Sequence, residues 1–395
     1  MKFSNLIDRV SGEGADAWKI YIAANEAKRG GRDVINLCIG DPNFDAPAVA
    51  TEAAIKALRD GDTHYADIPG RPALRSAIAA DFQSHTGVPT AASNAIFFAG
   101  AQNALYAVCQ CLFGAGDEVI VPEPTYVTYE ATIQASGAAI VKAPSPAKTA
   151  FHLDLDALAR AVTPKTRGIV FCNPNNPTGV VMTRAEIEAI AALARKHDLW
   201  VVSDEVYGGI TFERPHISIA AFEGMSERTA TISSLAKSHA MPGFRAGWVI
   251  GPKPLIEHLD TLSLCMLYGL PGFVQEAALA AITHGQADAE RMHAAYRRRR
   301  DAMVATLSRV QTLRVLVPEG GMFVLAGVEA TGLSAHDFAW RLLQATGVAV
   351  LPADAFGSSA KGHVRMSMGL DDADLAKAAE RITAFCHGLA TAKAT

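Results

Sequence analysis

Apolar and polar positions alternate in a regular way between residues 95 and 251. Short apolar runs are separated in most cases by segments with helical spacing of apolar residues, such as 101–113, 126–136 and 184–197. The seven strand-like runs are residues 96–98, 118–121, 139–141, 168–171, 200–202, 230–232 and 247–250. This order predicts an α/β fold with a mostly parallel seven-stranded sheet that helices cover on both faces.

The pattern changes on either side of this region. Residues 1 to about 35 indicate a helical arm, followed by a short strand that breaks into a Gly/Pro loop at Gly40. After Pro254 come helical patterns, the longest over about 287–310, and then a mixed α/β tail. We therefore expect three regions: an arm that belongs partly to a smaller domain (1–45), a large domain (46–285) and a small α/β domain (286–395).

Composition excludes several classes of partner. The formal net charge of −4 gives no long-range attraction for nucleic acid or an anionic membrane. The six cysteines form no Cys-x-x-Cys pair, which favours buried thiols in a reducing compartment, and no apolar run reaches the length that spans a membrane. These features predict a cytoplasmic protein without a metal site. The basic run 297–300 falls inside a helical pattern and is expected to be a solvated helix face.

Lys237 is the first candidate for chemistry. It follows the apolar run 229–232 and lies among small, uncharged residues with no carboxylate close to it in sequence. A lysine in such surroundings is the kind whose pKa is depressed, so that its amine becomes a nucleophile toward an aldehyde. A lysine in a solvated loop is the alternative.

Further polar residues follow two buried strands. Asn176 stands in a rigid turn with two prolines and a glycine, and Asp204 closes the run that precedes Tyr207. A partly buried carboxylate at a strand end needs a cationic partner, although a helix N-cap would also explain Asp204. Because ligands of parallel sheets bind at the carboxyl ends of the strands, these side chains predict a ligand site.

A phosphate site is predicted where the first strand turns into a helix. Gly100, Ala101 and Gln102 leave the backbone amides of the helix start open, and helix N-termini bind phosphate. Ser234 and Arg245 offer a hydroxyl and a fork-shaped cation for the same dianion.

Two aromatic residues and one arginine complete the set. Tyr126 follows a strand end and is placed to stack on a planar ring, whereas Tyr65 lies in a loop and has either a packing or a ligand role. Arg365 stands in an apolar run and needs an anion, either a substrate carboxylate or a structural aspartate. Together these residues fit a ligand that has a planar ring, an aldehyde, a phosphate, and a ring nitrogen that faces a carboxylate. Pyridoxal 5′-phosphate has all of these groups.

With these residues in this order, the chain resembles the class I/II aminotransferases of the aspartate aminotransferase fold (fold type I), from Gly40 to Arg365. The resemblance implies that the enzyme moves an α-amino group from an amino acid to a 2-oxo acid. It implies that Lys237 forms the Schiff base and moves the proton, that Asp204 holds the ring nitrogen protonated, and that Tyr207 and Asn176 donate to the ring oxygen.

The remaining roles also follow from the resemblance. Tyr126 would stack on the ring, and the phosphate would lie among Gly100, Ala101, Gln102, Ser234 and Arg245. Ala101 departs from the hydroxyl or small polar residue common in the family, so Gln102 or backbone amides must compensate.

The resemblance implies a homodimer with active sites at the subunit interface. Tyr65 would reach the phosphate of the neighbouring subunit. The substrate would contact Gly40, Asn176 and Arg365, the last through its α-carboxylate.

Several stretches resemble the arginine:pyruvate aminotransferases within this family. They are residues 63–67, 100–102, 126–131, 237–241, 265–269 and 295–301. This likeness implies L-arginine or another basic amino acid as donor and pyruvate as acceptor, with Asp16, Asp67 or Glu123 as partners for the guanidinium. The alternatives are aromatic, aliphatic or aspartate donors, a β-lyase or decarboxylase on the same scaffold, and a non-catalytic regulator.

Overall fold

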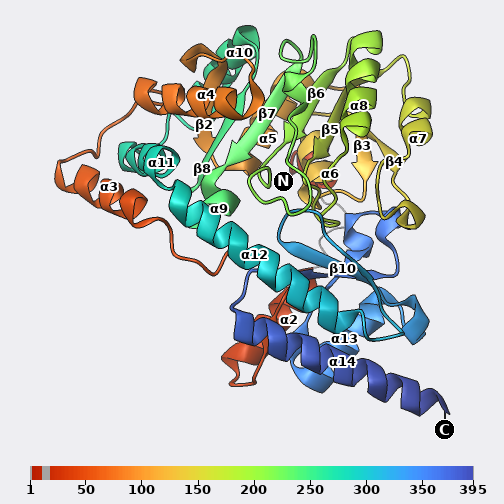
Figure 1. The fold of residues 1–395 in the computed structure, drawn as a ribbon. Coiled ribbons are helices and arrows are strands. Elements are labelled where there is room, and N and C mark those ends of the chain that lie inside the picture. The colour runs from red at the N-terminus through yellow and green to blue at the C-terminus, as the bar shows by residue number, and fades with distance from the viewer. Residues whose placement is uncertain (1, 11–17, 395) are drawn as a thin grey trace.

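The computed structural model describes residues 2–10 and 18–394. Its centre is a seven-stranded sheet in the order β2-β8-β7-β6-β5-β3-β4 (Figure 1). All neighbouring strands are parallel except at β8, which is antiparallel to both β2 and β7. The prediction of a mostly parallel seven-stranded sheet is confirmed. The strands are β2 (Ala95–Ala99), β3 (Glu118–Glu123), β4 (Ala139–Pro144), β5 (Thr166–Cys172), β6 (Trp200–Asp204), β7 (Thr229–Ser234) and β8 (Ala246–Ile250).

Alternation along the strands builds a core on each face of this sheet. In β3, Val119 and Val121 belong to the core that includes α5 (Ala101–Leu112), whereas Ile120 belongs to the core that includes α8 (Arg184–His197). Successive strand residues point to opposite faces, so an apolar strand contributes to both cores. The other helices of this part are α3 (Ala48–Arg59), α4 (Pro72–Thr86), α6 (Thr128–Ala135), α7 (Leu155–Arg160), α9 (Leu235–Ser238), α10 (Lys253–Met266) and α11 (Gly272–His284).

The C-terminal part forms a smaller antiparallel sheet in the order β12-β13-β10-β9. Its strands are β9 (Arg314–Leu316), β10 (Phe323–Gly327), β12 (Leu351–Pro352) and β13 (His363–Ser367). Helix α13 (Ala335–Thr346) packs on this sheet, and α14 (Asp372–Ala394) packs on α13 and on α12 (Gln286–Leu307). None of the helices in the described ranges is long and apolar enough to cross a membrane.

The N-terminal segment joins both parts. Helix α1 (Leu6–Val10) contacts α6 beside the large sheet, whereas α2 (Trp18–Arg29) contacts α13 and β12. Strand β1 (Ile35–Asn36) pairs in parallel with β11 (Val348–Ala349), so residues far apart in sequence share one strand pair. This pairing supports the predicted association of the arm with the C-terminal domain. The boundaries at residues 45 and 285 remain predictions.

Helix α12 (Gln286–Leu307) connects the two parts and runs diagonally between them in Figure 1. The expectation of a solvated basic face is wrong for Arg299 and Arg300, which are both buried. Arg299 donates to Asp372, to the side chain of Asn43 and to the Met368 carbonyl oxygen, and its guanidinium lies 4.7 Å from the centroid of the Phe44 ring. Fixed acceptors and an aromatic face replace the water that a guanidinium loses on burial.

Arg300 is held in the same way, by Glu213 at 2.7 Å and the Pro318 carbonyl oxygen at 3.1 Å. Arg299 therefore ties α12 to the C-terminal part and the loop after Gly40, while Arg300 ties it to the loop after β6.

Replacing Arg299 with alanine should lower the free energy of unfolding by about 2–4 kcal/mol, because the substitution removes several buried hydrogen bonds and a packed side-chain stem. The matched control is Arg298→Ala, since the neighbouring Arg298 side chain is 65% exposed. That variant should stay within about 0.5 kcal/mol of the parent in urea denaturation. Equal losses in the two variants would contradict the structural role of Arg299.

Candidate active site

A cavity of about 460 Å³ opens where β5, β6 and β7 end. One wall comes from these strand ends and the start of α5, and the opposite wall comes from β10, β13 and the loop around Gly40. The predicted site residues that line it are Gly40, Ala101, Gln102, Tyr126, Asn176, Asp204, Tyr207, Ser234, Lys237, Arg245 and Arg365. The structure thus brings together in one cavity residues that are spread over most of the chain.

Lys237 lies in the short helix α9, directly after β7. Its ammonium donates a hydrogen bond to the Gly40 carbonyl oxygen, across the cavity from its own strand. Burial lowers the pKa of Lys237 to about 8, the Asp41 carboxylate raises it, and Arg365 and Arg245 lower it further. Lys237 therefore gives up its proton more readily than an exposed lysine, which does not fit a solvated loop lysine.

Asp204 is buried at the end of β6. Its carboxylate accepts hydrogen bonds from the Tyr129 hydroxyl at 2.6 Å and from the Val206 amide at 3.2 Å. Burial raises the pKa of Asp204 to about 6, and the two hydrogen bonds act against that rise. The chain turns after Asp204 instead of starting a helix, so the N-cap interpretation is wrong.

Tyr129 is a residue that the sequence analysis missed. It is fully buried in α6, three residues after Tyr126, and the edge of one ring meets the face of the other at a centroid distance of 6.0 Å. Tyr126 precedes the helix, so the spacing of three residues between the two tyrosines was the available signal only under the expectation of a helix that begins at Tyr126.

The start of α5 forms a pocket of backbone amides beside Arg245. Gly100 has φ 82°, and a Cβ atom there would lie 2.5 Å from Nη2 of Arg245. Glycine adopts this positive φ without strain and leaves room for the guanidinium beside the helix start. Arg245 donates to the Pro242 carbonyl oxygen at 2.8 Å and to that of Ala99 at 3.3 Å.

The side-chain amide of Gln102 is already hydrogen-bonded within the protein. Its Nε2 donates to Thr132 at 2.9 Å, and its Oε1 accepts from Thr128 at 2.7 Å, so α6 holds the side chain. Of the two compensations expected for the missing hydroxyl of Ala101, the geometry favours the backbone amides. Ser234 lies at the cavity wall with its hydroxyl bonded to the Ala246 carbonyl oxygen at 2.8 Å.

Arg365 is buried in β13 and reaches the cavity from the C-terminal part. Its Nη1 donates to Asn176 at 2.9 Å, its Nη2 to the Cys38 carbonyl oxygen at 2.6 Å, and its Nε has no partner. Burial lowers the pKa of Arg365 to about 10. None of the ion pairs in the described ranges includes Arg365. This argues against a structural aspartate as its partner and favours the alternative, in which the guanidinium binds the anion of a ligand.

Tyr207 is buried beside Arg365 and meets the Phe323 ring edge-on at 6.2 Å. Burial raises the pKa of Tyr207 well above its ordinary value, so its hydroxyl stays protonated and remains a donor.

Tyr65 lies elsewhere. Its side chain is 87% exposed and packs edge-on against Tyr268 at 5.0 Å, outside the cavity. The predicted reach of Tyr65 into a neighbouring subunit remains a prediction.

Two of the three acids expected to meet a guanidinium, Glu123 and Asp67, do not line this cavity. Glu123 is buried and accepts hydrogen bonds from the Ser358 hydroxyl at 2.8 Å and the Ser359 amide at 2.6 Å. Asp67 is not among the cavity-lining residues, and Asp16 lies outside the described residues. Two residues that the sequence analysis did not propose, Trp18 and Asp41, do line the cavity.

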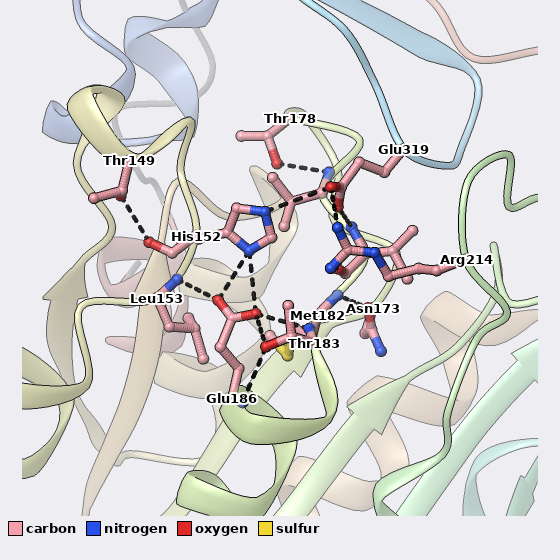
Figure 2. A network of polar contacts seen from close by, with 12 residues as sticks. Thr149, His152, Leu153, Asn173, Thr178, Met182, Thr183, Glu186, Arg214 and Glu319 are labelled. Atoms are coloured by element: carbon pink, nitrogen blue, oxygen red, sulfur yellow. Dashed lines mark hydrogen bonds and ion pairs between the residues drawn. The ribbon is translucent and has the colours of Figure 1, made fainter.

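A polar network away from the cavity secures the loop that carries Asn176 (Figure 2). His152 bonds to Glu186 at 3.1 Å and lies 3.6 Å from Glu319, which also pairs with Arg214 at 2.6 Å. Glu319 accepts from the Val181 amide, and its own amide donates to the Gly179 carbonyl oxygen. The segment before β10 is thereby fixed to the loop of residues 173–182.

The fold and the cavity define a class of enzyme. The structure matches a solved aspartate aminotransferase of Thermus thermophilus with maleate at a TM-score of 0.92 and 34% identity, over 97% of this chain and 99% of the other. An aspartate aminotransferase of Thermotoga maritima gives a TM-score of 0.92 at 28% identity, over 98% of this chain and 100% of the other. The protein has the aspartate aminotransferase fold, fold type I.

The sequence carries the assignment further. Residues 32–382 match the model of the family "Aminotransferase class I and II", and the chain belongs to this family and is an aminotransferase. It is 47% identical to the arginine–pyruvate transaminase AruH of Pseudomonas aeruginosa over 98% of both chains. It is 36% identical to the aspartate/prephenate aminotransferase of Thermus thermophilus over 91% of this chain and 92% of that relative.

The network in Figure 2 predicts a pH dependence of stability. Hydrogen bonds to Glu186 and then Glu319 raise the pKa of His152 from 6.5 to about 9. A pKa that is higher in the folded state gives stability that is complete below the unfolded pKa and is lost as pH rises through the folded one. The difference in free energy of unfolding between the parent and His152→Asn should therefore be larger at about pH 6 than at about pH 10.

The control for this series is His85→Asn, because the His85 side chain is 69% exposed. Urea denaturation at each pH measures both variants. A gap for His152→Asn that stays constant over this range would show that the histidine acts through packing and not through its charge.

Proposed function

We propose that this aminotransferase uses pyridoxal 5′-phosphate, takes L-arginine or another basic amino acid as donor, and passes the amino group to a 2-oxo acid such as pyruvate. One observation carries the proposal: a half-buried lysine with a lowered pKa shares a cavity with a buried acid, a helix start beside an arginine, and a buried arginine that lacks an anion.

The chemistry of the lining residues fits this cofactor. Tyr126 supplies an aromatic face, Asp204 an acceptor for a ring N–H, and Tyr207 and Asn176 polar groups at the same wall. The amides of Ala101 and Gln102 and the Arg245 guanidinium would hold the phosphate at the start of α5, and the Ser234 hydroxyl would join them by turning from the Ala246 carbonyl oxygen. When bound, pyridoxal 5′-phosphate supplies an aldehyde that traps amines and a ring that accepts electrons from the substrate Cα.

The residues of the chain divide the remaining work. Arg365 has an unpaired Nε and faces the cavity, so it would fork onto the α-carboxylate of donor and acceptor alike. Lys237 is a basic amine that would take a proton from the substrate Cα and return it at a nearby atom. Asp204 would keep a proton on the ring nitrogen through its buried carboxylate, which the Tyr129 hydroxyl holds in place.

The choice of donor rests on sequence likeness. A relative named arginine–pyruvate transaminase is 47% identical over nearly the whole chain. Free cysteines throughout the chain favour work in the cytoplasm, and the exposed Tyr65 favours a homodimer in which it reaches the partner's site.

Replacing Lys237 with alanine should abolish the covalent link to the cofactor while cofactor binding persists, because the phosphate and ring contacts remain. Turnover should fall by about 10³-fold or more. Borohydride reduction followed by peptide mass analysis measures the link, and dialysis measures retention. Lys253→Ala is the control, since that side chain is 66% exposed on α10. A reduced adduct on a peptide other than the one with Lys237 would contradict the assignment.

A panel of donors tests the substrate. Arginine and lysine should bleach the cofactor absorbance of the loaded enzyme and yield a 2-oxo acid when pyruvate or 2-oxoglutarate is supplied. Aromatic, aliphatic and acidic donors should react more slowly. If arginine and lysine leave the spectrum unchanged while aromatic or aliphatic donors bleach it, the proposed donor is wrong. Release of ammonia or carbon dioxide without an acceptor would point to elimination or decarboxylation.

A further inference from the structure

Charged side chains of the described residues line the cavity at five positions, namely Asp41, Asp204, Lys237, Arg245 and Arg365. The proposed reaction uses four of them, for the ring nitrogen, the aldehyde, the phosphate and the α-carboxylate. Asp41 is left over. It is also the only acid in this set besides Asp204, whose carboxylate is already bonded to Tyr129 and Val206.

The position of Asp41 suits contact with a substrate side chain. It lines the cavity and directly follows Gly40, whose carbonyl oxygen accepts the hydrogen bond from the Lys237 amine. Asp41 is exposed, and among the described residues its carboxylate has no hydrogen bond or ion pair in the structure. Its charge raises the pKa of Lys237, which shows that the carboxylate acts on the cavity and not only on bulk water.

An aromatic residue lines the cavity together with Asp41. Trp18 begins α2, and its ring is braced edge-on against Tyr21 at 6.0 Å. A guanidinium favours a carboxylate that accepts two N–H groups and an aromatic face that it can cover. A second carboxylate on the donor would instead meet the like charge of Asp41.

We infer that Asp41 receives the cationic end of the donor side chain, with Trp18 as the aromatic face that accompanies it. This inference rests on the proposed function, because it names the residue that would select a basic donor. Asp41 is not one of the three acids expected from sequence. Of those, Glu123 is bonded to Ser358 and Ser359, Asp67 does not line the cavity, and Asp16 lies outside the described residues.

The test compares arginine with citrulline, which has the same length and shape but a neutral end. In the parent enzyme, kcat/KM for arginine should exceed that for citrulline. In Asp41→Asn this ratio should fall by about 10- to 100-fold, the range expected for a hydrogen-bonded charge pair. Removing the Asp41 charge also lowers the pKa of Lys237, but that change affects both donors and cancels in the ratio.

Matched variants separate the local contact from general effects. Asp45→Asn removes an exposed aspartate from the same loop that does not line the cavity, so its ratio should equal that of the parent. Asp41→Glu keeps the charge and should keep most of the preference. Trp18→Leu should lower the ratio by a smaller factor, about threefold to tenfold.

A binding measurement gives a second readout that needs no turnover. The des-amino analogue of arginine cannot react, and its affinity for the cofactor-loaded protein can be measured by calorimetry against the matching des-amino analogue of citrulline. The parent should prefer the guanidinium compound, and Asp41→Asn should lose that preference.

The outcomes are distinct. A parent that does not prefer arginine to citrulline overturns both the basic donor and the inference. A parent that does prefer arginine, with an unchanged ratio and unchanged analogue binding in Asp41→Asn, leaves the donor standing and overturns the role of Asp41.

Discussion

The arrangement of the cavity depends on the partial burial of the Lys237 amine among other cations. Lys237 shares its cavity with Arg365 and Arg245, and burial and both arginines lower its pKa. Such an arrangement is unfavourable unless each cation has fixed acceptors. The Gly40, Cys38, Pro242 and Ala99 carbonyl oxygens provide them. The loop after β1 and the turn before β8 are therefore part of the site as much as the strand ends are.

The same principle explains how the two halves of the chain meet. Arg365 extends from β13 to Asn176 on the strand-end loop, and Glu319 fixes that loop to the segment before β10. Arg299 and Arg300 of α12 also connect the two parts, because each donates hydrogen bonds to acceptors on elements that are far away in sequence. Charged hydrogen bonds are directional, so these contacts set the orientation of the C-terminal part, whereas apolar packing alone tolerates sliding.

Most of the fold was predictable because alternation of strands and helices is a local pattern. The residues directly after the strands, such as Asn176 and Asp204, were predictable because parallel strands end at one edge. Burial of Arg299 and Arg300 was not, since a basic run on a helix has the same pattern whether it meets water or distant acceptors. Tyr129 and Asp41 were not predicted as site residues for a related reason: their roles depend on which residues the fold places beside them. The position of Tyr65 relative to a partner depends on a second chain.

The two cavity acids show how one site can serve two substrates in turn. Asp204 is buried and permanently bonded, which suits a partner that stays in place throughout the cycle. Asp41 is exposed, so water satisfies its charge when an acceptor without a cationic side chain occupies the cavity. A buried acid at that position would be left unpaired whenever pyruvate bound. In the proposed reaction, exposure of Asp41 would therefore allow selection of a basic donor without exclusion of an acceptor with a small uncharged side chain, while Arg365 would bind the carboxylate that both substrates share.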